Sequence, residues 1–296
     1  MYNEIASNKR RTVLLIAIFV VIVLALGWVI GQMTGYGYSG LVYAAIISFA
    51  MALFSYYSGD KIALAVAGAK GPLQQQENLY LWRIVENLCL ANGQPMPKIY
   101  TIPDQAINAF ATGRDPQHSS IAVTKGAIEK LTNEELEGVL AHELSHIKNY
   151  DIRLMMVVIV LVGIISLLAN WMFHFRLGGR GSDNRDSGAS SLFVIFGIVM
   201  ILISPIIAEL IKLAVSRRRE YLADASGVLL TRYPEGLANA LQKIAAENQP
   251  MAKATEATAH LYIANPFAGS RKLLTNLFST HPPIQDRIKK LREMGV

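Results

Sequence analysis

Residues Thr132–His146, which read TNEELEGVLAHELSH, contain the pattern that decides the fold and its chemistry. On a helix, side chains four positions apart lie on one face, so His142 and His146 can bind one zinc ion between them. Glu143 lies one position further round, where it can take a proton from a zinc-bound water without binding the metal itself. Zinc lowers the pKa of that water to about 7. The pattern predicts a hydrolytic zinc site; the alternative is two unrelated surface histidines on a helix.

The residues around this motif predict a polar, mostly helical region with a small β-sheet. Thr132 and Glu135 form a capping box, in which each side chain satisfies a free backbone amide at the start of the zinc-motif helix. The helical period of apolar residues over Gln74–Leu90 predicts an earlier helix that stops at Gly93. Short strands separated by Pro, Gly and Asp are expected over Lys98–Ile102, Asn108–Thr112 and Ser119–Thr124.

The composition of the whole chain indicates a membrane protein. Hydrophobic residues make up 52% of the 296 residues and charged residues 17%, whereas an average globular chain has about 25% charged residues. The mean hydropathy is +0.32. Some of this apolar excess is therefore expected to face lipid.

The positive charge of the chain, +6 in net terms, lies beside its apolar runs. Lys9–Arg11 precedes one run and Arg217–Arg219 follows another, which is typical of the cytoplasmic ends of membrane spans. No nucleic-acid-binding motif accompanies these residues, so we expect no nucleic-acid partner. Cys89 is the only cysteine, which rules out an internal disulfide and disfavours a thiolate metal site.

Four apolar stretches are long enough, or nearly so, to cross a bilayer, which requires about 20 apolar residues. They are Thr12–Gly31, Gly40–Tyr57, Leu154–Phe175 and Ser191–Ala208. The first exceeds the apolar part of a typical signal peptide and lacks a clear cleavage site, so it is interpreted as an uncleaved span. The third and fourth could instead form an apolar hairpin that packs on a soluble domain.

Together these patterns predict a multi-pass α-helical membrane protein with a mostly α, small β-sheet (α+β), zincin-like metallopeptidase domain. Four crossings place the basic flanks on the cytoplasmic side. The expected parts are a transmembrane hairpin over 1–59, a cytoplasmic catalytic region over 60–153, a second hairpin over 154–212 with a flexible loop at 176–190, and a C-terminal catalytic region over 213–296.

A catalytic zinc site needs a third protein ligand and an open fourth position. Glu220 is the candidate, because it shares a helix face with Asp224 four residues later. Glu220 can bind the metal while Asp224 accepts a hydrogen bond from the distal nitrogen of a ligand histidine. The alternative is a solvated helix face with Arg–Glu pairing.

Four motifs in this order resemble the HtpX heat-shock membrane metallopeptidases, relatives of the CAAX prenyl proteases. They are NAFATG over 108–113, LAHELSH over 140–146, SRRREYLAD over 216–224 and STHPP over 279–283. The resemblance covers nearly the whole chain.

The resemblance implies a role for each motif. One Zn²⁺ would be bound by His142, His146 and Glu220, with Glu143 as general base and later proton donor. Asp224 would support a ligand, and Asn108 would lie on an edge strand that pairs with an extended peptide substrate. His281 and Arg287 match a segment thought to face the cleft, where either could donate to the oxyanion; the alternative for His281 is a capped turn before two prolines.

The layout and the resemblance together suggest a zinc metalloendopeptidase of the bacterial inner membrane. Its substrates would be misfolded or damaged membrane proteins cleaved at the cytoplasmic face, and an ATP-dependent membrane protease is a possible partner. One alternative is a narrow processing protease of the CAAX type. Others are a non-enzymatic membrane metal-binding protein, disfavoured because the first two stretches have no ionisable residue and the third has only His174 near its end, and an inactive scaffold, disfavoured because Glu143 is intact.

Overall fold

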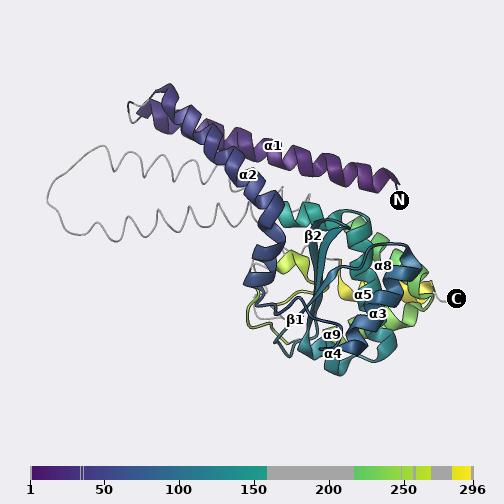
Figure 1. Cartoon of the computed structure of the whole chain (residues 1–296). Helices are drawn as coiled ribbons and strands as arrows, with labels where there is room; N and C mark the ends of the chain where they lie inside the picture. Colours follow the sequence, from purple (N-terminus) through teal and green to yellow (C-terminus); the bar gives the residue numbers. More distant parts are fainter. Residues whose placement is uncertain are drawn as a thin grey trace.

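Two long helices at the amino terminus form a hairpin that projects from a rounded body (Figure 1). The computed structural model describes residues 2–33, 35, 37–158, 217–247, 249–255, 258–267 and 282–294. The hairpin consists of α1 (Tyr2–Met33) and α2 (Tyr38–Val66). These helices contain the first two predicted apolar stretches, Thr12–Gly31 and Gly40–Tyr57.

Small residues let the two helices approach closely near their turn. A Cβ atom on Gly27 would lie 2.1 Å from the Cβ of Ala44, and one on Gly40 would lie 2.7 Å from the Cα of Gly31. Both distances are too short for a side chain, so the glycines permit direct backbone packing. Such contacts are typical of helices that associate in lipid.

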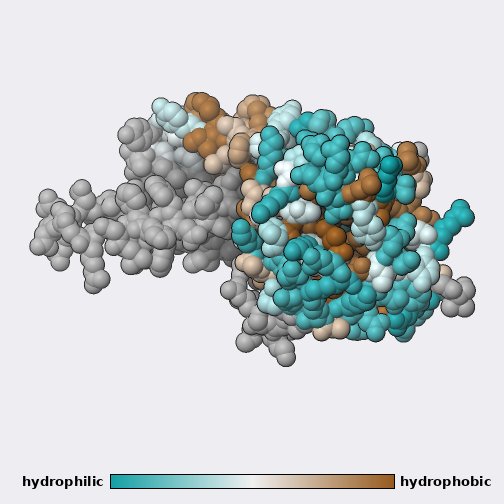
Figure 2. All heavy atoms as spheres, turned by 60° about the horizontal axis from the view of Figure 1, so that its bottom comes forward, coloured by the Kyte–Doolittle hydropathy of each residue, from teal (hydrophilic) through white to brown (hydrophobic). Residues whose placement is uncertain are grey.

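The outer surface of the hairpin is strongly apolar. Large hydrophobic side chains on α2 with exposures of 57–66% include Phe54, Ile46, Tyr43 and Phe49. Among the described residues, α2 is the one helix long and apolar enough to cross a membrane by length and composition. Figure 2 shows apolar residues on the hairpin, while hydrophilic residues cover most of the visible surface of the body.

The body contains a three-stranded mixed sheet with strand order β1-β3-β2. Strand β1 (Lys98–Ile102) pairs in parallel with β3 (His118–Thr124), and β2 (Ala109–Asp115) pairs antiparallel to β3. The three strands lie where the sequence predicts them, although β2 starts one residue later and ends three residues later than expected. Its position leaves β2 at one edge of the sheet.

Helix starts and stops follow local side-chain chemistry. Helix α3 (Leu79–Asn92) begins five residues after the predicted start, because Asn78 caps it by accepting from the amide of Leu81, and it ends at Gly93 with left-handed backbone as predicted. The short α4 (Lys125–Lys130) precedes α5 (Asn133–Lys148), which carries the zinc motif and begins with the predicted capping box.

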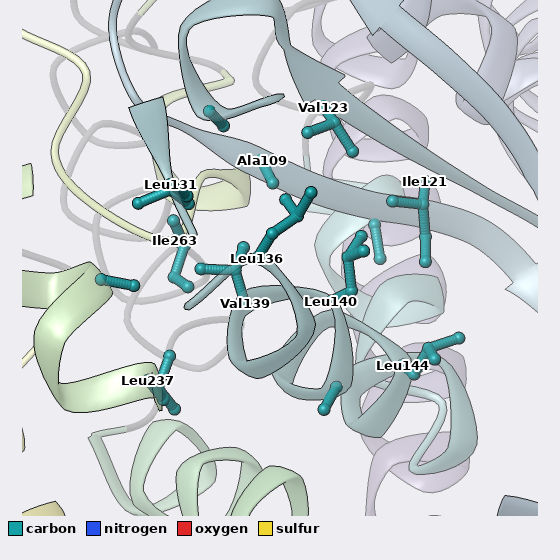
Figure 3. Close-up of a cluster of buried hydrophobic side chains, with 14 of the residues drawn as sticks. Ala109, Ile121, Val123, Leu131, Leu136, Val139, Leu140, Leu144, Leu237 and Ile263 are labelled. Carbon is teal, nitrogen blue, oxygen red and sulfur yellow. The ribbon is translucent and has the colours of Figure 1, made fainter. Parts of the chain in front are cut away.

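Helix α5 is the centre of the core. Its apolar side chains Leu136, Val139, Leu140 and Leu144 lie against the sheet residues Ala109, Ile121 and Val123 (Figure 3). The remaining described elements are residues 151–158, which are helical, α8 (Arg217–Thr231), α9 (Pro234–Glu247), the 3-10 turn η1 (Ala259–Leu261) and α11 (Ile284–Glu293). Helices α8 and α9 pack on α5, and α11 packs on both.

Helix α1 also contacts the body. Its buried residues Leu15 and Phe19 cluster with Leu154, Val157 and Val158 of the helical segment 151–158. Most of the third predicted apolar stretch, all of the fourth and the loop 176–190 lie outside the described residues. The multi-pass arrangement and the domain boundaries therefore remain predictions.

Candidate metal centre

Helix α5 places its two histidines side by side inside the body. The Nε2 atoms of His142 and His146 are 3.2 Å apart, and both side chains are buried. The pairing follows from the four-residue spacing, which aligns the two rings one above the other on one face. Glu143 is buried beside them.

Helix α8 brings Glu220 to the same point. Its Oε2 lies 3.8 Å from Nε2 of His142, and its Oε1 lies 3.5 Å from Nε2 of His146. The helices approach closely at Gly227, where a Cβ would lie 3.1 Å from the backbone nitrogen of His142. Small residues on α8 therefore allow a ligand from a distant part of the chain to reach the histidine pair.

These three side chains fit a metal ion. Their ligand atoms all lie within 4.8 Å of one another. Tetrahedral zinc with bonds of about 2.0–2.1 Å requires neighbouring ligand atoms to be separated by about 3.4 Å; the two histidine nitrogens are 3.2 Å apart, and each has a different oxygen of Glu220 within 3.5–3.8 Å. Two imidazoles and one carboxylate also form a known donor set for catalytic zinc.

Asp224 fixes the orientation of His142. Its Oδ1 lies 2.9 Å from Nδ1 of His142, so that Nε2 is the atom directed at the centre. Arg287 from α11 donates to both carboxylate oxygens of Asp224, at 2.9 Å from Nε and 2.7 Å from Nη2. Its Nη1 donates to the carbonyl of Ile263 at 2.9 Å.

The electrostatics of this pair follow from its burial and its partners. Burial alone would raise the pKa of Asp224, but Arg287 and His142 outweigh it and hold the pKa at about 2. Burial lowers the pKa of His142, with Asp224 opposing the change. The ionised carboxylate is therefore strongly favoured opposite the guanidinium.

Asp151 plays the corresponding part for His146, and the sequence reasoning missed it. Its Oδ2 lies 2.9 Å from Nδ1 of His146. The carboxylate returns to the histidine because Tyr150, between α5 and the next helical segment, has a left-handed φ of 60°. An acidic residue soon after the second histidine, next to a helix end, was the available signal. Burial opposes protonation of His146, but Asp151 and Glu220 raise its pKa to about 9 in the metal-free protein.

Glu143 lies between the ligands and the sheet. Burial raises its pKa to about 8, the negative charge of Glu220 adds to this effect, and His146 opposes it. The backbone amide of Ala111, on edge strand β2, donates a hydrogen bond to it. A carboxyl group is thus held beside the centre and next to the edge strand of the sheet.

Of the other two predicted site residues, Asn108 lies within the described structure and His281 does not. Asn108 immediately precedes β2, but its side chain is buried; its Nδ2 donates to the carbonyl of Ala264 at 3.2 Å and its Oδ1 accepts from the amide of Ala109. The structure thus engages this amide group within the chain. His281 lies outside the described residues.

Comparison with known proteins places this centre in a family. A model of peptidase family M48 matches residues 75–295. Curated relatives, each described as "Protease HtpX homolog", include one from Dictyoglomus thermophilum that is 43% identical and covers 99% of this chain and 95% of its own length. One from Lactobacillus helveticus is 45% identical, with coverage of 99% and 100%, and one from Thermoanaerobacter pseudethanolicus is 44% identical, with coverage of 99% and 98%.

A solved structure has a similar fold. The crystal structure of S. mikatae Ste24p aligns with 98% of this chain and 67% of its own, with a TM-score of 0.50 and 19% sequence identity. At this identity the likeness concerns the fold alone. It agrees with a mostly helical protein that contains a small mixed sheet.

Proposed function

The chain belongs to peptidase family M48, and from that premise we propose that it is a zinc-dependent endopeptidase acting at a membrane surface. It is a metalloprotease by family. The observation that carries the choice of metal is the meeting of His142, His146 and Glu220, a donor set of two imidazoles and one carboxylate whose ligand atoms lie within 4.8 Å of one another.

We propose that His142, His146 and Glu220 hold the metal and that Glu143 is the general base. Bound zinc supplies Lewis acidity, which lowers the pKa of water and polarises the substrate carbonyl. Glu143 accepts the proton of the attacking water and then gives it to the departing amine. A metal cation bound by the three ligands would lower the pKa of Glu143 and so favour its carboxylate form, which is the form that accepts the proton of water.

Asp224 and Arg287 support this centre by orienting His142, one of the proposed ligands. Asp224 holds the tautomer of His142, and the guanidinium of Arg287 holds Asp224 through two hydrogen bonds. Since these bonds and the one to Ile263 engage Nε, Nη1 and Nη2 of Arg287, a positioning role suits it better than donation to the oxyanion. His281 keeps its proposed role as an oxyanion donor.

Substrate binding as an added β-strand is supported by the place of β2. This strand lies at the edge of the sheet beside Glu143, and extended peptides bind such edges through main-chain hydrogen bonds. At the start of the strand, the carbonyl of Ala109 already accepts from the amide of Ile263. A peptide would therefore pair with residues of β2 that follow Ala109. Asn108 would act by holding the start of β2 in place through its side-chain hydrogen bonds.

We further propose that the protein is a multi-pass protein of the bacterial inner membrane with its site on the cytoplasmic side. The apolar exterior of α2 supports at least one span. Helix α1 has 32 residues, which at 1.5 Å per residue gives about 48 Å, more than the ~30 Å of the hydrocarbon core. Its first residues, including Lys9–Arg11, would lie outside the lipid and against the body.

This placement suggests the substrates. Polypeptide segments close to the membrane surface, including cytoplasmic loops of misfolded or damaged membrane proteins, would reach β2 most readily. Such an activity belongs to protein quality control under stress, alongside an ATP-dependent membrane protease. A narrow CAAX-type processing activity is the second candidate, and the likeness of the fold to Ste24p is the observation that favours testing it.

The test uses the purified full-length chain in detergent with a fluorogenic membrane-protein substrate. Glu143→Gln should keep zinc and lose cleavage by about 10²–10⁴-fold, and a chelator should abolish cleavage in the wild type. Glu137→Gln, a partly buried position on the same helix, is the matched control and should retain full activity. A prenylated peptide is offered in parallel.

Three results would count against parts of the proposal. Undiminished cleavage by Glu143→Gln, or after chelation, would overturn the mechanism. Full zinc occupancy and activity in Glu220→Ala would remove Glu220 from the site. Cleavage of the prenylated peptide alone would favour the CAAX-type activity over general proteolysis.

A further inference from the structure

Asn8, on the amino-terminal helix α1, is buried where this helix contacts the body, just before its apolar stretch begins. Its Nδ2 donates to the carbonyl of Asn149 at 2.9 Å and to Oδ1 of Asp151 at 2.7 Å. Its Oδ1 accepts from Nη1 of Arg219 at 3.3 Å. One amide thus joins α1, the end of α5 and the start of α8.

The partners of Asn8 lead to two of the three candidate ligands. The other oxygen of Asp151 lies 2.9 Å from Nδ1 of His146, so the two carboxylate oxygens are divided between the histidine and the asparagine. Arg219 immediately precedes Glu220 in α8 and lies 3.6 Å from the same Oδ1 of Asp151. Asn8 is therefore linked to His146 through Asp151 and to Glu220 through Arg219.

Helix α1 also supports the strained connection that delivers Asp151. Tyr150 has a φ of 60°, a left-handed conformation in which the Cβ lies too close to the following carbonyl oxygen. The ammonium of Lys9 lies 4.3 Å from the centre of its ring, and the guanidinium of Arg153 lies 4.9 Å from it. Consecutive residues of α1 thus hold both the ring of Tyr150 and the carboxylate of Asp151.

We propose that Asn8 is a positioning residue for the metal centre: through Asp151, the amino-terminal helix orients His146. The proposal rests on the zinc site proposed above. It assigns α1 a share in assembling the catalytic centre, besides any role as a membrane anchor. Removal of its hydrogen bonds should leave Oδ1 of Asp151 with the guanidinium of Arg219, at 3.6 Å, as its neighbour and hold the carboxylate less firmly against the histidine.

The experiment measures zinc affinity by chelator competition in the full-length protein in detergent. Asn8→Leu keeps the side-chain volume without the hydrogen bonds, and Asn8→Ser keeps a single, shorter donor. Mutation of groups that orient metal ligands typically costs 10–100-fold in metal affinity. Because Asn8 contacts Asp151 and not the ligand itself, we expect a loss at the lower end, about 10-fold. The cobalt-substituted variants should show altered visible absorption. Val13→Ala, on the exposed face of α1, is the matched control and should match the wild type.

A double-mutant cycle separates positioning from general anchoring. In an Asp151→Ala background, Asn8→Leu should cause less than about a 2-fold further loss of zinc affinity, because coupled residues are not additive. All affinities are measured below the unfolding midpoint of the least stable variant. Wild-type affinity and cobalt spectrum in Asn8→Leu, or full additivity with Asp151→Ala, would overturn the proposal, whereas a smaller loss in Asn8→Ser than in Asn8→Leu would support it. A chain that binds zinc as expected but cleaves nothing would refute the protease and leave this inference standing.

Discussion

Replacement of Arg287 by alanine should destabilise the body more than any surface change on the same helix. Its guanidinium makes two hydrogen bonds to Asp224 and one to the carbonyl of Ile263, all buried. Removal of one partner from a buried ion pair costs about 3–5 kcal/mol, because the other charge is left uncompensated. For a domain of 150–250 residues, about 2–4 °C of melting temperature is lost per kcal/mol. The expected fall is about 6–20 °C.

The assay is thermal unfolding of the metal-free protein in detergent, so that zinc binding does not add to the stability. Arg287→Lys keeps the charge but not the two-pronged geometry, and an intermediate fall is expected. Arg292→Ala is the matched control on α11: its contacts with Gln242 and Glu235 are exposed, and such pairs contribute about 0–1 kcal/mol. An equal effect of Arg287→Ala and Arg292→Ala would refute the claim that the buried pair holds α11 on the site.

Three further predictions concern other parts of the body. Gly138→Ala should lower stability by about 1–3 kcal/mol, since its Cβ would lie 2.7 Å from the backbone nitrogen of Leu237; a rise in melting temperature would contradict this packing. Burial raises the pKa of the Cys89 thiol to about 11, so alkylation at pH 8 should be slow in the folded protein and fast in denaturant; equal rates would show an accessible thiol. The pKa of Asp224, held at about 2 against an ordinary ~3.9, should add about 2–3 kcal/mol of metal-free stability that is present above pH ~4 and lost as the pH falls through 2, and acid unfolding of Asp224→Asn should lack this component.

Local patterns in the sequence were reliable where a few neighbouring residues decide the structure. The capping box at Thr132 and the stop at Gly93 are confirmed, because each depends on contacts within one helical turn. The start of α3 was predicted too early, since apolar periodicity does not reveal that Asn78 caps the helix. His142 and His146 were expected to lie together from their spacing alone, and they do.

Long-range contacts could not be obtained in this way. Glu220 was placed near the histidines through its own motif. Nothing in the spacing of the motifs indicated that the guanidinium of Arg287 would donate two hydrogen bonds to Asp224. Asn8 and Asp151 are 143 positions apart, and an asparagine before an apolar run carries no sign of a distant carboxylate. The parallel pairing of β1 with β3 likewise depends on the whole body rather than on either strand.

The separation of the site residues along the chain has a consequence for synthesis. The histidine pair is translated first, Glu220 follows 78 residues after His142, and Arg287 comes 145 residues after it. At about 5–20 residues per second, a nascent chain holds the histidine pair for about 7–30 seconds before Arg287 has been added. If the proposed site is the active one, the nascent chain lacks part of it during that interval, and the order of synthesis delays cleavage of other chains near the ribosome.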